Sequence, residues 1–352
     1  MNPSKVDQAT DIPEKNDPIL EKNQSMKRNT FALMGLAALA IANSHLEQLY
    51  PLSFLAADGL LGNLTFFMLA GYGVMASQSQ RPDPLPSFYL RRIRRIYPTL
   101  WLGVVLAEWV GISGLNWNSA WEAAGNLIWP TPYRFVSQIM IFYPVVWALG
   151  RIPARAGQAA LVAGLIWLGS WCWFLGQPPH PNPALGKLPT SYWAAFFLTG
   201  TLTGAWLATK NWRMVWGWYW TAVLVLVLVY GAVKCETALR NFTTPAAVPT
   251  LVLGGVLQIL SLGMVGLLVA GVEKVNELLE LFRIKKILDW VGKMSLQVYV
   301  LHGLFIGSLA GLPVFWGLKI GLFFILTLLT SLAVFWLDQR LPELGAREPK
   351  NS

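Results

Sequence analysis

Two of the three histidines are the residues of this sequence with the clearest capacity for chemistry. His45 and His302 each lie near the end of a long apolar segment, and the two segments are far apart in the sequence. Imidazole is the natural general base for an alcohol nucleophile at neutral pH. Each histidine is therefore a candidate catalytic base. The alternative, an interior histidine that is hydrogen-bonded for packing, stays open for each of them taken alone.

Helix geometry predicts that the two histidines reach a similar depth. His45 lies 17 residues beyond Arg28, and His302 lies 16 residues beyond Lys286. At a rise of about 1.5 Å per residue, these spacings place the histidines roughly 26 Å and roughly 24 Å along their helices. Ionisable groups at that depth of a membrane are costly, so each is a candidate for function.

Three further polar residues accompany the histidines. Asn43 comes two residues before His45, and Tyr299 shares a helix face with His302 because the two are three residues apart. Glu108 lies about 13 residues past the nearest arginine, or roughly 20 Å along a helix. Its carboxylate would either orient a histidine or pair with an interior cation.

A cluster of arginines lies in the stretch SFYLRRIRRIYP, directly before an apolar run that begins at Tyr97. Its members are Arg91, Arg92, Arg94 and Arg95. Arginines collect on the cytoplasmic side of membrane proteins, so the cluster predicts a topological anchor. Guanidinium groups also match phosphate oxygens two bonds at a time, which makes the cluster a candidate site for a phosphorylated ligand.

Apolar helices must position these residues. The chain has 352 residues, of which 55% are hydrophobic and 13% are charged, and a soluble protein carries about twice that charge. Apolar runs of about 18 residues or more recur, each long enough to cross a bilayer core of about 30 Å. The sequence thus predicts an all-α fold, a polytopic transmembrane helical bundle of about ten spans. The expected spans are 30–48, 60–78, 97–114, 133–150, 156–175, 189–208, 214–234, 251–271, 286–308 and 314–337.

The distribution of basic residues orients this bundle. With the N-terminus inside, most of the 27 lysines and arginines fall in the inner tails and loops. This bias places both termini and the arginine cluster in the cytoplasm. We expect a disordered cytoplasmic tail over residues 1–28, because that segment is polar and mixed in charge. A ten-helix transmembrane domain follows over 29–338, and a cytoplasmic tail over 339–352.

Composition argues against several kinds of site and partner. Two cysteines, Cys172 and Cys235, are too few for a metal cluster or a disulfide framework, and we expect no metal. The sequence carries no nucleic-acid motif, so we expect no nucleic-acid partner. The net charge of +9 instead indicates attraction to anionic membrane lipids.

Six segments, taken in their order and spacing, carry a family resemblance. They are NSH at Asn43–His45, GNLTFFMLAGYGV at Gly62–Val74, FYLRRIRRIYP at Phe88–Pro98, IMIFYPVVW at Ile139–Trp147, FFLTGTLTGAW at Phe196–Trp206 and VGKMSLQVYVLH at Val291–His302. Together they resemble the acyltransferase-3 family of bacterial integral membrane proteins. The resemblance runs over roughly residues 30 to 338.

The resemblance implies an enzyme that moves acyl groups, most often acetyl, from cytoplasmic acyl-CoA to a hydroxyl of a sugar. The acceptor would be a cell-surface polysaccharide or a lipid-linked glycan, with glycan-biosynthesis proteins as partners, in the bacterial inner membrane. The family's catalytic histidine falls on His45, and its arginine motif, which would meet the CoA phosphates, falls on the cluster. The family usually has an arginine about eleven residues before that histidine, where this chain has Met34.

The residues and the resemblance together suggest a mechanism. Acetyl-CoA, or another short acyl-CoA, would dock on the arginines and extend its pantetheine arm over about 25 Å between the helices. His45 would take the proton of the acceptor hydroxyl, and Tyr299, Asn43 or His302 would donate a hydrogen bond to the developing oxyanion. Two other hypotheses remain open: a transporter or flippase, and a non-catalytic membrane subunit of a glycan-assembly complex. The acyl group and the acceptor stay open as well.

Overall fold

The structure is a computed structural model, and it describes residues 30–345 except 53–54, 57–58, 81, 112–114, 129–132, 176–188, 211–215 and 244–246. Across these residues all regular secondary structure is helical, so the all-α prediction is confirmed. The tail predicted at residues 1–28 lies outside the described residues. The last helix continues to Gly345, past the expected end of the transmembrane domain at residue 338.

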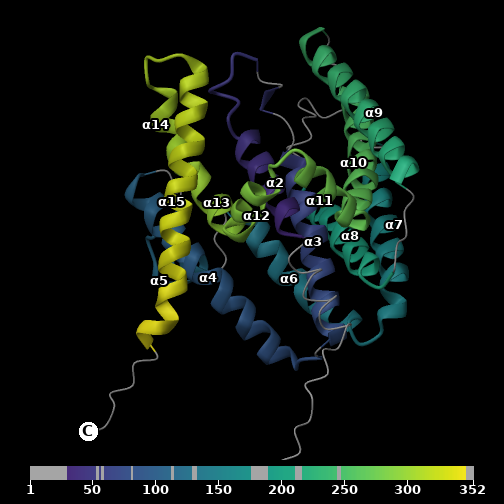
Figure 1. Ribbon diagram of the computed structural model, residues 1–352, viewed down its shortest axis with the longest axis horizontal. Coiled ribbons are helices and arrows are strands. Elements are labelled where there is room, and N and C mark those ends of the chain that lie inside the picture. Colours follow the sequence, from purple (N-terminus) through teal and green to yellow (C-terminus); the bar gives the residue numbers. More distant parts are fainter. Residues whose placement is uncertain are drawn as a thin grey trace, which may run out of the picture.

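Figure 1 shows how the described helices are arranged. The α-helices are α2 (Phe31–Ser44), α3 (Gly59–Gln80), α4 (Leu85–Trp109), α5 (Ala120–Ile128), α6 (Arg134–Leu149), α7 (Ala156–Leu175), α8 (Thr190–Leu207), α9 (Trp216–Thr243), α10 (Ala247–Ala270), α11 (Val272–Leu281), α12 (Lys285–Lys293), α13 (Ser295–Leu301), α14 (Ile306–Ala310) and α15 (Trp316–Gly345). Two short 3₁₀ helices, η3 (Pro153–Arg155) and η5 (His302–Phe305), complete the described elements.

Five helices in the described part of the chain are long and apolar enough to cross a membrane. They include residues of α3, α7, α9, α10 and α15. Three shorter apolar helices lie at Phe31–Ser44, Phe135–Leu149 and Ser295–Ala310. The chain therefore contains several candidate membrane spans, while the count of about ten and the cytoplasmic position of both termini stay predictions.

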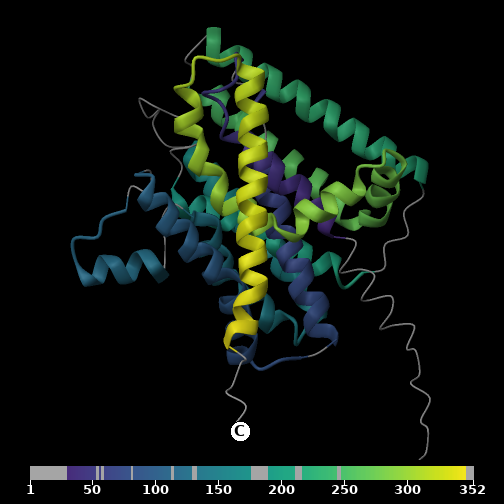
Figure 2. The same cartoon turned by 60° about the vertical axis from the view of Figure 1, so that its left-hand side comes forward.

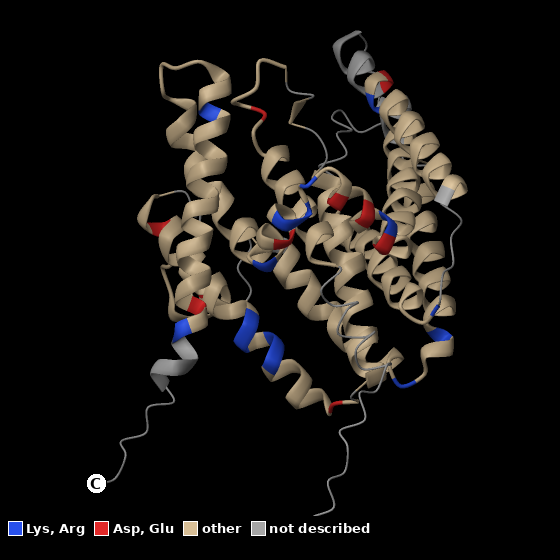
Figure 3. Ribbon diagram, viewed as in Figure 1, with Lys and Arg blue, Asp and Glu red and all other residues tan. Residues whose placement is uncertain are grey.

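The bundle is organised around α3, which packs against α2, α6, α8 and α10. On another side, α15 packs against α4 and α13 and runs the height of the molecule as the yellow helix of Figure 2. The long helices carry few charges. Figure 3 shows basic residues gathered on the first half of α4 and around α11 and α12. The charged part of the protein is thus concentrated on a few elements.

A close crossing of α2 and α12 holds together the segments that carry the two histidines. A Cβ atom added at Gly35 would lie 2.3 Å from the carbonyl oxygen of Leu288, and one added at Gly292 would lie 1.9 Å from that of Phe31. Only glycine allows this approach, because any side chain would overlap the opposite backbone. The crossing therefore fixes α2, which ends next to His45, relative to the segment that leads into α13.

The predicted span 286–308 is not one continuous helix. It consists of α12, α13, η5 and α14, with a break at Met294 and a 3₁₀ turn at His302. One physical cause lies at the second break, where the imidazole Nδ1 of His302 is 2.7 Å from the carbonyl oxygen of Tyr299. An uninterrupted α-helix would pair that oxygen with the backbone N–H four residues on, so the side chain competes with the helix.

Candidate active site

A cavity of about 300 Å³ opens between α2, α3, α4, α6 and α13. It follows one face of α3, where the lining includes Phe66, Ala70, Gly73, Ser77 and Gln80. The first and last of these positions are 14 residue steps apart, or roughly 21 Å of helix. We call the end near Ser77 and Gln80 the mouth, and the end near Phe66 the inner end.

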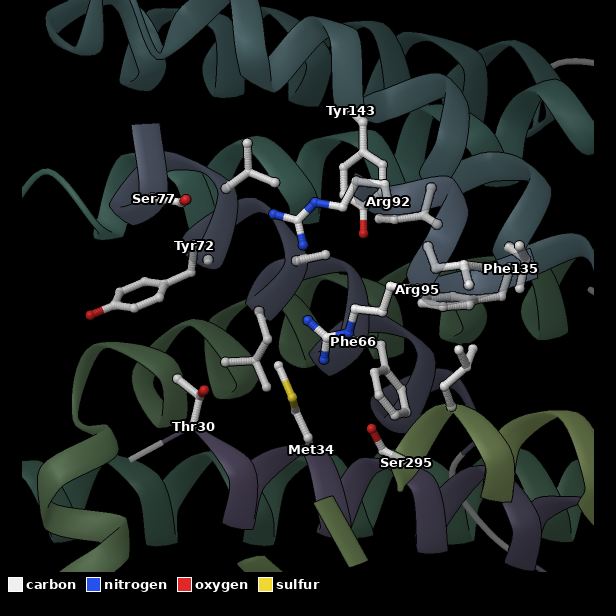
Figure 4. Close-up of a pocket in the computed structure, with 18 of the residues that line it drawn as sticks. Thr30, Met34, Phe66, Tyr72, Ser77, Arg92, Arg95, Phe135, Tyr143 and Ser295 are labelled. Carbon is white, nitrogen blue, oxygen red and sulfur yellow. The ribbon is translucent and has the colours of Figure 1, made fainter. Parts of the chain in front are cut away.

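The structure divides the arginine cluster into two pairs. Arg92 and Arg95 line the cavity, and Figure 4 shows both guanidinium groups directed into it. Arg91 forms a salt bridge with Asp83 outside the cavity wall. Arg94 is exposed and is not part of the cavity wall. Of the four residues predicted to bind phosphate, two thus face the cavity, and the role itself stays a prediction.

The cluster also lies within α4 rather than in front of it. The apolar run at Tyr97 suggested a later start, but the helix begins at Leu85, and Pro98 sits in its interior. Proline is well tolerated in the first turn of a helix, where Pro86 stands. The arginines therefore project from a helix at fixed spacing. Arg92 and Arg95, three residues apart, share one face.

Aromatic rings, and the lack of a carboxylate among the described residues of the cavity wall, define the setting of the two cavity arginines. The Cζ atom of Arg92 lies 5.2 Å from the ring centres of both Phe88 and Tyr143. Both arginines stay charged in this setting, because the ordinary pKa of arginine is above about 12. The described residues that line the cavity include no carboxylate. The positive charges of Arg92 and Arg95 therefore make this cavity suited to an anionic ligand.

The two histidines meet near the inner end of this cavity. The ring centres of His45 and His302 are 4.9 Å apart. Their meeting agrees with the similar depths predicted from the helix rise, although their catalytic roles stay predictions. His302 is buried at 9% exposure, whereas His45, just past the end of α2, is exposed. The pair therefore joins the interior of the protein to an accessible surface.

The contact between His302 and Tyr299 assigns the tautomer of His302. The carbonyl oxygen of Tyr299 can only accept a hydrogen bond, so Nδ1 of the neutral ring donates to it and Nε2 carries the lone pair. The ring of Tyr299 lines the cavity and has its centre 6.0 Å from that of His302. Tyr299 thus stands between the cavity and the histidine pair. Neither histidine itself lines the cavity.

Asn43 and Glu108 have partners away from the cavity. The Asn43 amide donates to the carbonyl oxygen of Leu55 at 2.9 Å, and its oxygen accepts from the hydroxyl of Tyr50 at 2.5 Å. Asn43 therefore ties down the segment after α2. Glu108 is exposed, and its carboxylate accepts a hydrogen bond from the indole of Trp117 at 2.9 Å. This contact links Glu108 to the segment after α4, and its proposed role beside a histidine stays a prediction.

A polar trio of the buried Thr99 and Gln297 with the partly buried Asp338 anchors α13, the helix that carries Tyr299. The side-chain amide of Gln297 donates to Thr99 at 3.1 Å and to Asp338 at 2.9 Å. The Thr99 hydroxyl also donates to Asp338. These contacts join α13 to α4 and α15. The trio was not predicted, because an isolated polar residue in a membrane helix does not reveal its partner.

Several cavity residues also went unrecognised in the sequence. Phe66, Phe135 and Tyr143 line the cavity but belong to apolar segments that look alike on every face. Met34, which stands where the family usually has an arginine, lines the same cavity as Arg92 and Arg95. The departure from the family pattern therefore falls inside the candidate site.

Comparison with known proteins supplies the family. The model of the acyltransferase domain matches residues 33–338, which is most of the chain. The comparisons with curated proteins and with solved structures gave no match. The match covers all the residues that build the cavity's inner end and the histidine pair. The chain belongs to the acyltransferase domain family Acyl_transf_3 and is a membrane acyltransferase.

Proposed function

We propose that this enzyme moves a short acyl group, most often acetyl, from a cytoplasmic acyl-CoA to a hydroxyl of a sugar. The acceptor is a cell-surface polysaccharide or a lipid-linked glycan. One observation carries the proposal: a single cavity runs from Arg92 and Arg95 to Tyr299, and Tyr299 adjoins the histidine pair. The arginines that would bind the donor phosphates thus lie in one part of the site, and the candidate base lies in the other.

The shape of the cavity supports docking of the donor by its phosphates. The guanidinium groups of Arg92 and Arg95 each present several N–H donors in a fixed plane, a geometry that suits phosphate oxygens. A volume of about 300 Å³ is at the small end of ligand sites, which span about 300–1,000 Å³. It suits the pantetheine arm, while the nucleotide stays at the mouth. The inner part is lined by apolar side chains such as Leu69 and Ile139, which exclude water from the thioester.

The chemistry follows from the positions of the histidines. The acceptor oxygen attacks the thioester carbon while His45 takes the hydroxyl proton, because His45 is the exposed member of the pair. The carbon–sulfur bond breaks, and the leaving thiolate of CoA takes the proton back from the imidazolium. His302, with its lone pair on Nε2, serves as an acceptor that orients His45 rather than as an oxyanion donor. The hydroxyl of Tyr299 is the better oxyanion donor.

The surroundings follow from the same proposal. Exposed apolar side chains on α9 and α15 suit contact with lipid tails, and we place the enzyme in the bacterial inner membrane. Carbohydrate or glycolipid acceptors approach on the side of His45. Glycan-biosynthesis proteins would supply them.

Substitution of His45 tests the proposal directly. We expect His45→Ala to lower the rate of acyl transfer by about a hundredfold or more, because a general base contributes about 10²–10⁴ to the rate. The measurement is mass spectrometry of surface glycans in cells that carry the variant, with the amount of inserted protein matched. His180→Ala is the control, since it makes the same change at the third histidine, which lies outside the described part of the chain. Wild-type acylation by a folded, inserted His45→Ala protein would exclude His45 as the base.

A further inference from the structure

Three aromatic rings from three helices close the inner end of the cavity. Phe66 comes from α3, Phe135 from α6 and Tyr299 from α13, and all three line the cavity. The ring centres of Phe66 and Phe135 are 5.5 Å apart, and those of Phe135 and Tyr299 are 5.1 Å apart. These distances are those of direct ring packing. We call these three residues the aromatic wall.

The aromatic wall reaches the histidine pair through Tyr299. Tyr299 is the last ring of the wall, and the ring of His302 follows at 6.0 Å between centres. A thioester that approaches the histidines from the cavity must therefore bring its acyl group against these rings.

A second layer of aromatic side chains holds the wall in place. The edge of Phe135 packs against Phe67 with 4.7 Å between ring centres. Phe67 is 1% exposed, stacks on Phe197 at 4.5 Å and also contacts Phe142 at 5.6 Å. Close-packed side chains cannot rotate without displacing their neighbours. Phe135 is therefore a fixed surface rather than a mobile lid.

We infer that the aromatic wall is the device that sets the size of the acyl group, so that acetyl is accepted and longer acyl groups are rejected. This inference rests on the proposed function and deepens it, because it names the residues that choose the donor. Phe66 and Phe135 do so by bulk, since neither carries a polar atom on its side chain. An added methylene that has no space in a fitted pocket costs about tenfold or more in binding.

Binding of two unreactive donor analogues tests the inference without an acceptor. Acetonyl-CoA and 2-oxoheptyl-CoA carry ketones in place of the acetyl and hexanoyl thioesters. The full chain, in lipid nanodiscs, is titrated with each analogue. We expect the wild type to bind acetonyl-CoA at least about tenfold more tightly than 2-oxoheptyl-CoA. We expect Phe135→Ala and Phe66→Ala to reduce this ratio to about threefold or less, chiefly through tighter binding of the longer analogue.

Matched variants separate selectivity from loss of structure. Phe323→Ala removes a ring from α15 that is more deeply buried than Phe66 or Phe135 and does not line the cavity, and we expect it to keep the wild-type ratio. Phe135→Leu removes less volume and serves if the alanine variant does not assemble. Equal binding of both analogues by the wild type overturns the inference, as does a wild-type ratio in folded variants of both Phe66 and Phe135. If free CoA and both analogues all fail to bind, the donor assigned under the proposed function is wrong and the inference falls with it. Binding without chain-length selection refutes the aromatic wall alone.

Discussion

The two sides of the histidine pair differ in how far the protein encloses them: one is a cavity between helices, and the other is an exposed surface. On the cavity side, five helices enclose a volume of about 300 Å³ that contains two cations and ends in packed aromatic rings. On the other side, His45 stands exposed at the end of α2, followed by the exposed residues Glu47 and Gln48. Under the proposed function, the side that would take the donor is preformed and the side that would take the acceptor is open. We therefore expect the chain itself to select the donor and to admit acceptors of varied size.

The largest expected effect comes from a change that would break the link between the two sides. In Gly292→Ala, the new Cβ would lie 1.9 Å from the backbone oxygen of Phe31, and neither backbone can give way cheaply. We expect the variant to lose about 3 kcal/mol or more of stability and to lose acyl transfer, because α2 and α12 are forced apart. Thermal unfolding in detergent and transfer assays measure both quantities. Gly266→Ala, where an added Cβ meets nothing within 4 Å, is the control and retains activity.

An intermediate effect is expected from removing the cavity arginines, and it tests whether they bind the donor. Arg92→Ala and Arg95→Ala each remove a cation from the cavity, and we expect each to weaken binding of CoA by about tenfold to a hundredfold. Titration of the purified protein with CoA measures this loss, which shrinks as salt is added. Arg94→Ala makes the same change on the exposed face of α4 and leaves CoA binding within about twofold. Equal losses from all three variants would mean that the whole cluster, rather than the cavity pair, attracts the donor.

The smallest expected effect concerns the support of Tyr299 and His302. Asp338→Ala leaves the buried donors of Thr99 and Gln297 without their acceptor, which costs about 1–3 kcal/mol. We expect kcat to fall severalfold while the affinity for CoA stays nearly unchanged, because the trio positions α13 and does not line the cavity. Asp338→Asn keeps a carbonyl oxygen as acceptor and should recover part of kcat. A loss of CoA affinity equal to the loss of kcat would contradict a positioning role.

Much of the architecture followed from the sequence because a bilayer restricts the choices. Long apolar runs must form helices there, since backbone groups need internal partners in lipid. Each of the ten expected spans overlaps a helix or a run of helices. The rise of a helix then brought His45 and His302 to a common depth, and their rings do meet.

The sequence could not show which face of each helix would line the site. In the arginine cluster, Arg91 and Arg94 are three residues apart, and so are Arg92 and Arg95. Helix spacing alone therefore favours neither pair. The packing of α4 against α6 and the salt bridge of Arg91 with Asp83 decide the matter. The break of the ninth segment at His302 was also beyond the sequence pattern, because it depends on a contact between a side chain and the backbone.

The sequence by itself determined an all-helical membrane acyltransferase with two histidines at one depth and a basic cluster on one helix. The apolar runs, the arginine cluster and the segments that match the family depend only on residue type and spacing, so they can be identified without the structure. Only the tertiary structure decided that Arg92 and Arg95 share a cavity with Phe66 and Phe135, and that Asn43 and Glu108 have partners elsewhere. The physical reason is that lipid tails are as apolar as a helix interior, so hydrophobicity does not distinguish a cavity wall from a lipid-facing surface.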